Sequence, residues 1–367
     1  MSSDSMLSFG KLRGSYGTTG SDNIGDYQFL STYNVTGYEY NGTLVLEPSG
    51  ISNPLFGWEV NKKLEVALEL GFIKDRILIN TAWYQNRSSN QLVGIPLAAT
   101  TGFSSLTGNL DATVQNTGWE IDLNTRNILN ENFKWTTTFN ISIPKSKLLA
   151  FPDIENSTFA STYVVGQPIS IRKLYKATGV NPETGIYEFE DYNDDGVITS
   201  LEDRQWIEDL APEFYGGLGN TFTYKNLSLN LLFQFKKQKA FNNYRQQAAP
   251  GLMQNASVSY LNRWQQPGDD TPLMIATSGL NYSLNPSRDQ FRQSNMAVSD
   301  ASFIRLRNAT LNYTIPNQAS EKFAVDVYLQ GQNLWTLTNF DGPDPEHSSH
   351  IILPPLRQIS LGAQFNF

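Results

Sequence analysis

Residues 358–367, the last ten of the chain, read QISLGAQFNF. Apolar side chains occupy every second position from Ile359 to Phe367, and Ser, Gly, Gln and Asn stand between them. A period of two places successive side chains on opposite faces of a β-strand. This stretch is therefore expected to be a strand with one apolar face and one polar face.

The same alternation recurs at nine further places. It is clearest in residues 64–72, 134–143 and 227–235, and weaker in 12–16, 77–83, 119–123, 218–224, 309–315 and 325–329. No amphipathic helix of comparable length is predicted between these stretches. The sequence therefore predicts an all-β fold with ten antiparallel strands.

The connections between these strands alternate in length. The short ones are Lys74-Asp75, 127–132, Lys225-Asn226 and 316–322, and the long ones are 18–57, 86–111, 145–212, 238–301 and 339–356. Such alternation places every long connection at one end of an antiparallel sheet, which is the pattern of transmembrane β-barrels. Soluble domains rarely contain structureless connections of this length. We expect part of a transmembrane β-barrel with long extracellular loops.

The composition argues against several functions. The 367 residues include 27 Lys and Arg against 35 Asp and Glu, so the net charge is −8 and nucleic acid is not an expected partner. The chain has no Cys, which excludes disulfides and thiolate sites. Its two histidines, His347 and His350, share one Pro-rich segment, which argues against an enzyme with a nucleophile and a base. Mean hydropathy is −0.36, and no apolar run approaches the ~20 residues of a membrane-spanning helix.

Four phrases of the sequence carry a family resemblance. They are FGKLRGSYGTTG at 9–20, PEFYGGLGNTFTYK at 212–225, SFIRLRNATLNY at 302–313 and YLQGQNLWTLT at 328–338. In this order, and with a terminal Phe, they resemble the barrel of SusC/RagA-type TonB-linked outer-membrane transporters. The predicted organisation is a polar N-terminal segment at residues 1–6 and a TonB-dependent receptor-like β-barrel domain at 7–367.

The resemblance implies TonB-dependent import of oligosaccharides, other glycans or peptides across the outer membrane of a Bacteroidetes-type cell, without enzymatic activity. It implies as partners a SusD-like lipoprotein over the external loops, the TonB complex and the lipids of the outer membrane. Such transporters close with 22 strands around a plug, and a sheet of ten strands would leave two unpaired edges in lipid. We interpret the chain as the C-terminal part of a larger barrel. The family's plug, early strands and TonB-contacting segment have no counterpart in this sequence.

Residues 191–202, DYNDDGVITSLE, match the calcium-loop pattern D-x-[DN]-x-[DN]-G-x5-E at every constrained position. The predicted ligands of a structural Ca²⁺ are Asp191, Asn193, Asp195, the carbonyl of Val197, Thr199 through water, and Glu202. The family that the chain resembles often carries Asp at the position of Glu202, so Asp203 is an alternative last ligand. An acidic solvated turn is the other interpretation of Asn-Asp-Asp-Gly. A bound Ca²⁺ is expected to order the connection 145–212.

An alternative function is that of a calcium-dependent adhesin or carbohydrate-binding β domain, in which the acidic loop and the aromatic residues would bind a ligand at a soluble surface. A soluble sandwich of two packed sheets is the alternative fold, because its strands also alternate apolar and polar residues. For either function the substrate-binding residues are not predicted. Several aromatic residues of the long connections could stack on sugar rings: Tyr38, Tyr40, Trp58, Phe103, Tyr244, Trp264 and Tyr282.

Overall fold

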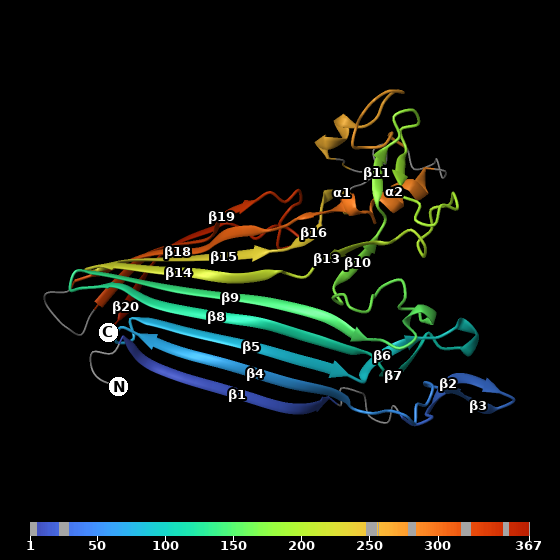
Figure 1. The fold of residues 1–367 in the computed structure, drawn as a ribbon, viewed down its shortest axis with the longest axis horizontal. Helices are drawn as coiled ribbons and strands as arrows, with labels where there is room; N and C mark the ends of the chain where they lie inside the picture. Colours follow the sequence, from blue (N-terminus) through green and yellow to red (C-terminus); the bar gives the residue numbers. More distant parts are fainter. Residues whose placement is uncertain are drawn as a thin grey trace.

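Ten long strands lie side by side in one curved antiparallel sheet (Figure 1). The computed structural model describes residues 6–21, 29–246, 255, 257–277, 284–316, 324–347 and 352–366. The strands are β1 (Leu7–Ser21), β4 (Glu59–Phe72), β5 (Ile77–Ser89), β8 (Thr113–Leu129), β9 (Phe133–Ala150), β14 (Phe214–Tyr224), β15 (Leu227–Lys237), β18 (Phe303–Ile315), β19 (Ala324–Thr338) and β20 (Gln358–Asn366). Their order in the sheet follows their order in the chain. The predictions of ten strands and of an all-β fold are confirmed.

The sheet has one polar face and one apolar face. On β4, Ala67 lies opposite Arg13 of β1 and Ala82 of β5, whereas the next residue, Leu68, lies opposite Leu12. Leu12 is 74% exposed. Further large side chains exposed on the apolar face are Val66, Trp119, Leu311, Leu329 and Leu361. A contiguous exposed apolar surface of this extent marks contact with lipid or with another apolar surface.

The sheet is a single open layer. Among the described residues, the other sheets have two strands each, and none is a second long sheet packed on the first. The alternative of a two-sheet soluble domain is therefore wrong. Within the same residues β1 pairs only with β4, and β20 pairs only with β19, so both edges of the sheet are unpaired, as predicted.

Short and long connections lie at opposite ends of the sheet, called here the turn end and the loop end (Figure 1). At the turn end, β4 and β5 are joined through Ile73, Lys74 and Asp75, whose φ angles are all positive, at 54°, 52° and 60°. The hydroxyl of Ser8 on β1 donates a hydrogen bond of 2.6 Å to Asp75 Oδ1, which ties this turn to the neighbouring strand. The predicted alternation of connections is confirmed.

The long connections have secondary structure of their own. In the described residues they contain five two-stranded sheets, formed by β2 (Tyr33–Tyr40) with β3 (Thr43–Pro48), β6 (Gln91–Pro96) with β7 (Ser105–Leu110), β10 (Ile171–Leu174) with β13 (Trp206–Asp209), β11 (Ala177–Val180) with β12 (Tyr187–Phe189), and β16 (Lys239–Phe241) with β17 (Val298–Asp300). The α-helices are α1 (Asn243–Gln246) and α2 (Asn285–Phe291), and the 3-10 helices are Ala99–Thr101, Ile154–Asn156, Val258–Asn262 and Asn295–Ala297. Connections 151–213 and 238–302 pack on one another: Tyr187 stacks on Phe291 with ring centroids 3.7 Å apart, and Met274 is buried beside them.

Some predictions fall outside the described residues. Residues 1–5 of the predicted N-terminal segment lie outside them, as do His350, Tyr282 and Phe367. None of the helices within the described ranges is long and apolar enough to cross a membrane.

Candidate functional site

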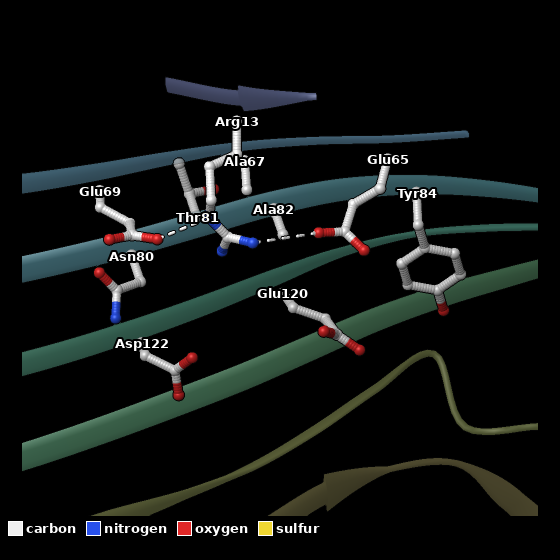
Figure 2. Close-up of a pocket in the computed structure, with 10 residues that line it drawn as sticks. All are labelled: Arg13, Glu65, Ala67, Glu69, Asn80, Thr81, Ala82, Tyr84, Glu120 and Asp122. Carbon is white, nitrogen blue, oxygen red and sulfur yellow. Dashed lines mark hydrogen bonds and ion pairs between the residues drawn. The ribbon is translucent and has the colours of Figure 1, made fainter. Parts of the chain in front are cut away.

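A charged patch lies on the polar face where β1, β4, β5 and β8 run side by side (Figure 2). Arg13 of β1 points between two carboxylates of β4: its Nε donates to Glu69 Oε1 at 2.6 Å, and its Nη1 lies 3.9 Å from Glu65 Oε1. Glu120 and Asp122 of β8 line the same patch, and no ion pair in the described part of the chain includes them. Lys11 of β1 also lies 3.8 Å from Glu69, so two cations face four carboxylates and this part of the sheet is acidic.

The ring of Tyr84 borders this patch and lies against Gly118, its partner across β5 and β8. A Cβ atom at residue 118 would come within 2.5 Å of the Tyr84 hydroxyl oxygen. Glycine at this point lets the aromatic ring approach the backbone of the neighbouring strand, and a larger residue would displace the ring.

The connection between β19 and β20 folds back onto the polar face of β18. Arg305 of β18 is 2% exposed, and its guanidinium lies 2.5 Å from Asp344 Oδ2 and 3.0 Å from Glu346 Oε2. Its Nε donates to Thr336 Oγ1 at 2.9 Å, and Arg307 pairs with the same Glu346 carboxylate. We call Arg305, Arg307, Asp344 and Glu346 the loop clamp. A buried guanidinium needs such partners, so the clamp fixes this connection to the wall.

The loop clamp was not predicted from the sequence. A signal was present, because two arginines stand two residues apart on a predicted strand and two carboxylates stand two residues apart downstream. The pairing itself joins residues that are 39 and 41 positions apart, and no local pattern indicates it.

Residues 191–203 form a tight loop held by its own side chains. The Gly196 N–H donates to Asp191 Oδ2 at 2.7 Å, and the Val197 N–H donates to Asp195 Oδ1 at 2.8 Å. Gly196 has a φ of 81°, which glycine adopts without strain. The other carboxylate oxygen of Asp191 is buried, without a hydrogen-bond partner among the described residues. A buried carboxylate oxygen with no donor fits a hard cation at the first position of a calcium loop.

The remaining predicted ligands are brought together only in part. Asn193 Nδ2 donates to Asp195 Oδ2 at 3.0 Å, and Thr199 Oγ1 lies 3.2 Å from Glu202 Oε2. Within the described ranges, no three His, Cys, Asp or Glu side chains are grouped so that they could hold a metal ion. The calcium site stays a prediction.

Asp203, the alternative last ligand, has a different environment from Glu202. Asp203 is fully buried, and its two oxygens accept hydrogen bonds from the Tyr192 N–H at 2.8 Å and from the Thr199 N–H at 2.7 Å. Glu202 is exposed. Asp203 therefore holds the two halves of the loop together, while the carboxylate of Glu202 is more available to an ion.

The loop aromatics divide into exposed and structural residues. Tyr38 and Tyr40 of β2 are each 80% exposed, and Trp58 is 65% exposed. Trp264, in contrast, is 7% exposed, and its Nε1 donates to the carbonyl oxygen of Pro182 at 2.8 Å. The exposed rings are accessible to a ligand, whereas Trp264 packs two connections together.

These features define the class of protein. A curved antiparallel sheet with one apolar face, one charged face and all long connections at one end is the wall of a transmembrane β-barrel. The apolar face contacts lipid and the polar face lines the lumen. Because unpaired edges are not tolerated in lipid, further strands must close the barrel.

Comparisons with known proteins narrow this class to a family. The family model "TonB dependent receptor-like, beta-barrel" matches residues 7–334, and the chain belongs to this family. It is similar to the TonB-dependent receptor P3 of Formosa agariphila, with 29% identity over 92% of this chain and 36% of that protein. It is also similar to the TonB-dependent receptor SusC of Bacteroides thetaiotaomicron, with 26% identity over 95% of this chain and 36% of that protein.

A solved structure shows the same fold. The structure of the RagAB peptide transporter matches with a TM-score of 0.79 and 26% identity, covering 98% of this chain and 41% of that chain. The chain thus spans about 36–41% of the length of these relatives. The resemblance to SusC/RagA-type proteins and the interpretation as part of a larger barrel are confirmed. The predicted outer-membrane location and the predicted lack of enzymatic activity agree with the family.

Proposed function

We propose that the protein containing this chain imports oligosaccharides or peptides across the outer membrane in a TonB-dependent manner. The observation that carries the proposal is the charged polar face around Arg13, Glu69 and Glu120, set back to back with an exposed apolar face. A lumen lined by such groups suits hydrophilic solutes. The similar RagAB structure is that of a peptide transporter, and the resemblance to SusC-type proteins adds glycans as a second substrate class.

Three partners belong to this proposal. Outer-membrane lipids cover the apolar face, and the TonB complex acts through a part of the transporter outside this chain. A SusD-like lipoprotein covers the loop end, where the folded connections expose Leu201, Val258 and Leu261 at 75%, 78% and 69%. Exposed apolar side chains on an ordered surface are typical of an interface with another protein.

Calcium has a structural role in the same proposal. It is bound by residues 191–202, through Asp191, Asn193, Asp195, the carbonyl of Val197 and Glu202, with Thr199 acting through water. The support is the unpartnered Asp191 oxygen and the turn at Gly196. Bound Ca²⁺ would order the connection between β9 and β14.

The experiment that tests import is uptake by cells that lack the gene, complemented with the full-length transporter. Labelled oligopeptides and oligosaccharides of several compositions are supplied with and without functional TonB. We expect uptake of one class to require both the transporter and TonB. Equal uptake in the deletion strain, or uptake that continues without TonB, would contradict the proposal. Recovery of a lipoprotein with the affinity-tagged transporter tests the partner at the loop end.

A further inference from the structure

Four arginines gather at the loop end, where connections 151–213 and 238–302 meet. We call them the arginine cluster: Arg172 on β10, Arg204 before β13, Arg245 on α1 and Arg292 at the end of α2. Nη1 of Arg245 donates to the carbonyl oxygen of Arg292 at 2.9 Å, and Nε of Arg292 donates to the carbonyl oxygen of Arg245 at 2.8 Å. Burial, and then the positive charges of the other three members, lower the pKa of Arg245. The hydrogen bonds hold Arg245 and Arg292 side by side, and Arg204 donates to the carbonyl oxygen of Lys173, the residue after Arg172.

The backbone around Arg204 fixes its position in the cluster. Its Nε and Nη2 donate to the carbonyl oxygen of Lys173 at 3.1 and 2.9 Å, and its guanidinium carbon lies 5.9 Å from the centre of the Tyr175 ring. Tyr175 in turn forms backbone hydrogen bonds with Gln293 and Asn295, which follow α2. The two connections thus hold the cluster in one arrangement.

Within the described part of the chain, none of the four arginines forms an ion pair with a carboxylate. Glu208 stands opposite Arg172 across β10 and β13, but its carboxylate pairs with Lys239 and accepts a hydrogen bond from Trp206 Nε1. Residues 247–256 and 278–283, which are close to α1 and α2 in sequence, contain neither Asp nor Glu. Carboxylates of the same region have other partners: Asp203 accepts two backbone N–H groups, Asp289 pairs with Arg288, and Asp341 accepts a hydrogen bond from Asn243.

The described residues accept few of the hydrogen bonds that the cluster can donate. A guanidinium has five N–H groups, so four of them present about twenty. The described residues supply five hydrogen bonds to these groups, all from backbone carbonyls. No arginine nitrogen is among the buried atoms without a partner in the described ranges, so the other donors reach solvent. Arg172 is exposed, and the other three arginines are half-buried.

We propose that the arginine cluster binds carboxylate groups of the imported substrate. The inference rests on the proposed import function and gives its substrate a chemical class. Guanidinium forks bind carboxylates through pairs of parallel N–H···O bonds, which are shorter and stronger than hydrogen bonds between neutral groups. Acidic peptides and oligosaccharides of uronic acids both carry this group. The cluster lies at the loop end beside the connection between β19 and β20, since Asn243 of α1 donates a hydrogen bond to Asp341 of that connection.

The test uses the full-length transporter purified in detergent, with Arg245→Gln and Arg292→Gln combined. Pentaglutamate and trigalacturonate are the carboxylate probes, and end-blocked penta-alanine and maltotriose are uncharged probes of matching length. We expect the wild type to bind at least one carboxylate probe, with an affinity that falls as salt is added. The double variant should bind that probe about tenfold more weakly or worse, as expected for the loss of one or more charged hydrogen bonds.

Two further variants keep the test decisive. Arg263→Gln is the matched control, since Arg263 lies in the same connection and donates to the Tyr260 carbonyl oxygen without belonging to the cluster. Arg172→Gln removes an exposed member with little effect on packing, so weaker binding in this variant does not reflect misfolding. A full effect in Arg263→Gln would overturn the assignment.

The outcomes separate this inference from the proposed function. Preference for pentaglutamate assigns the carboxylate to a peptide, and preference for trigalacturonate assigns it to a uronic acid. Equal binding of the carboxylate probes by wild type and variants, or no binding by wild type, would overturn the inference. If carboxylate binding fails in this way while uptake in cells is TonB-dependent, the import function stands and only the carboxylate inference fails. If TonB-dependent uptake is absent while carboxylate binding depends on the cluster, the import function fails and the binding site stands.

Discussion

Arg305 of β18 and Asp344, 39 residues later in the chain, form an ion pair of 2.5 Å between Nη2 and Oδ2. Their side chains are only 2% and 6% exposed. The pair joins a strand of the wall to the connection between β19 and β20, and Gln238 Nε2 reinforces this contact by donating to the Pro345 carbonyl oxygen at 2.7 Å. This connection is therefore a fixed part of the wall at the loop end.

Removing the arginine of this pair should release the connection. Arg305→Leu leaves the buried Asp344 without its ion-pair partner, and breaking a buried ion pair on one side costs about 3–5 kcal/mol. Because 1.4 kcal/mol corresponds to a factor of ten, we expect proteolysis between residues 339 and 357 of the full-length transporter to accelerate by about a hundredfold or more. Arg87→Leu is the control, since Arg87 is exposed and donates through its Nε to Gln115. Similar cleavage rates in the two variants would show that the ion pair does not hold the connection.

Charge should be tolerated differently on the two faces of the sheet. Leu68 lies on the apolar face, and placing an arginine there near the bilayer midplane costs about 2–4 kcal/mol. We expect Leu68→Arg to impair insertion of the full-length barrel into lipid vesicles far more than Glu65→Leu, which changes a partly exposed carboxylate 3.9 Å from Arg13. Folded and unfolded fractions are separated by electrophoresis without heating. Equal impairment by the two substitutions would contradict the assignment of the faces.

Asp300 of β17 should give the connection between β15 and β18 a weak dependence on pH. A hydrogen bond from Ser302, followed by one from Lys237, lowers the pKa of Asp300 to about 2. An Asp in an unfolded chain has a pKa of about 3.9. Since the pKa falls on folding, the stabilisation is fully present above about pH 4 and is lost as the pH falls toward 2. The effect is small because the side chain is 55% exposed.

Hydrogen exchange of the amides at 298–302 measures this dependence in the wild type and in Asp300→Asn. We expect the wild type to be better protected above about pH 4, and the difference to disappear near pH 2. If the wild type and Asp300→Asn differed in protection only at low pH, the pH dependence would be the reverse of the expected one. The lowered pKa of Asp300 would then not be its cause.

The parts of the fold that the sequence predicted are those with local causes. Alternation along residues 358–366 or 227–235 depends only on the two faces of a strand, so strands and faces are correct. The strand ends at the loop end were not predicted correctly. Strand β5 continues to Ser89 and β9 to Ala150, beyond the predicted stretches. There the sheet continues where the regular alternation of apolar and polar residues has ended.

The candidate sites also divide into those with local causes in the sequence and those that depend on distant residues. The turn at Gly196 and its hydrogen bond to Asp191 follow from spacing within one loop, and both are present. The loop clamp and the arginine cluster bring together residues from separate connections. No local sequence pattern marks any of these arginines as part of a site. The sheet topology and the packing of the connections place them side by side.

Calcium should bind the loop at 191–202 and depend on its first and third acidic positions. We expect Asp191→Ala with Asp195→Ala to abolish binding that calorimetry detects in the full-length transporter, with a dissociation constant of about 10⁻⁴–10⁻³ M, as in extracellular modules. Asp194→Asn is the matched control, because Asp194 stands at an unconstrained position of the same loop and Asn tolerates its φ of 56°. Glu202→Ala should weaken calcium binding, since the Glu202 carboxylate is exposed and available to the ion. Asp203→Asn should loosen the loop with or without calcium, because it weakens the hydrogen bonds from the Tyr192 and Thr199 N–H groups. No heat of binding at millimolar calcium, or binding that survives the double substitution, would leave the sequence as an acidic turn.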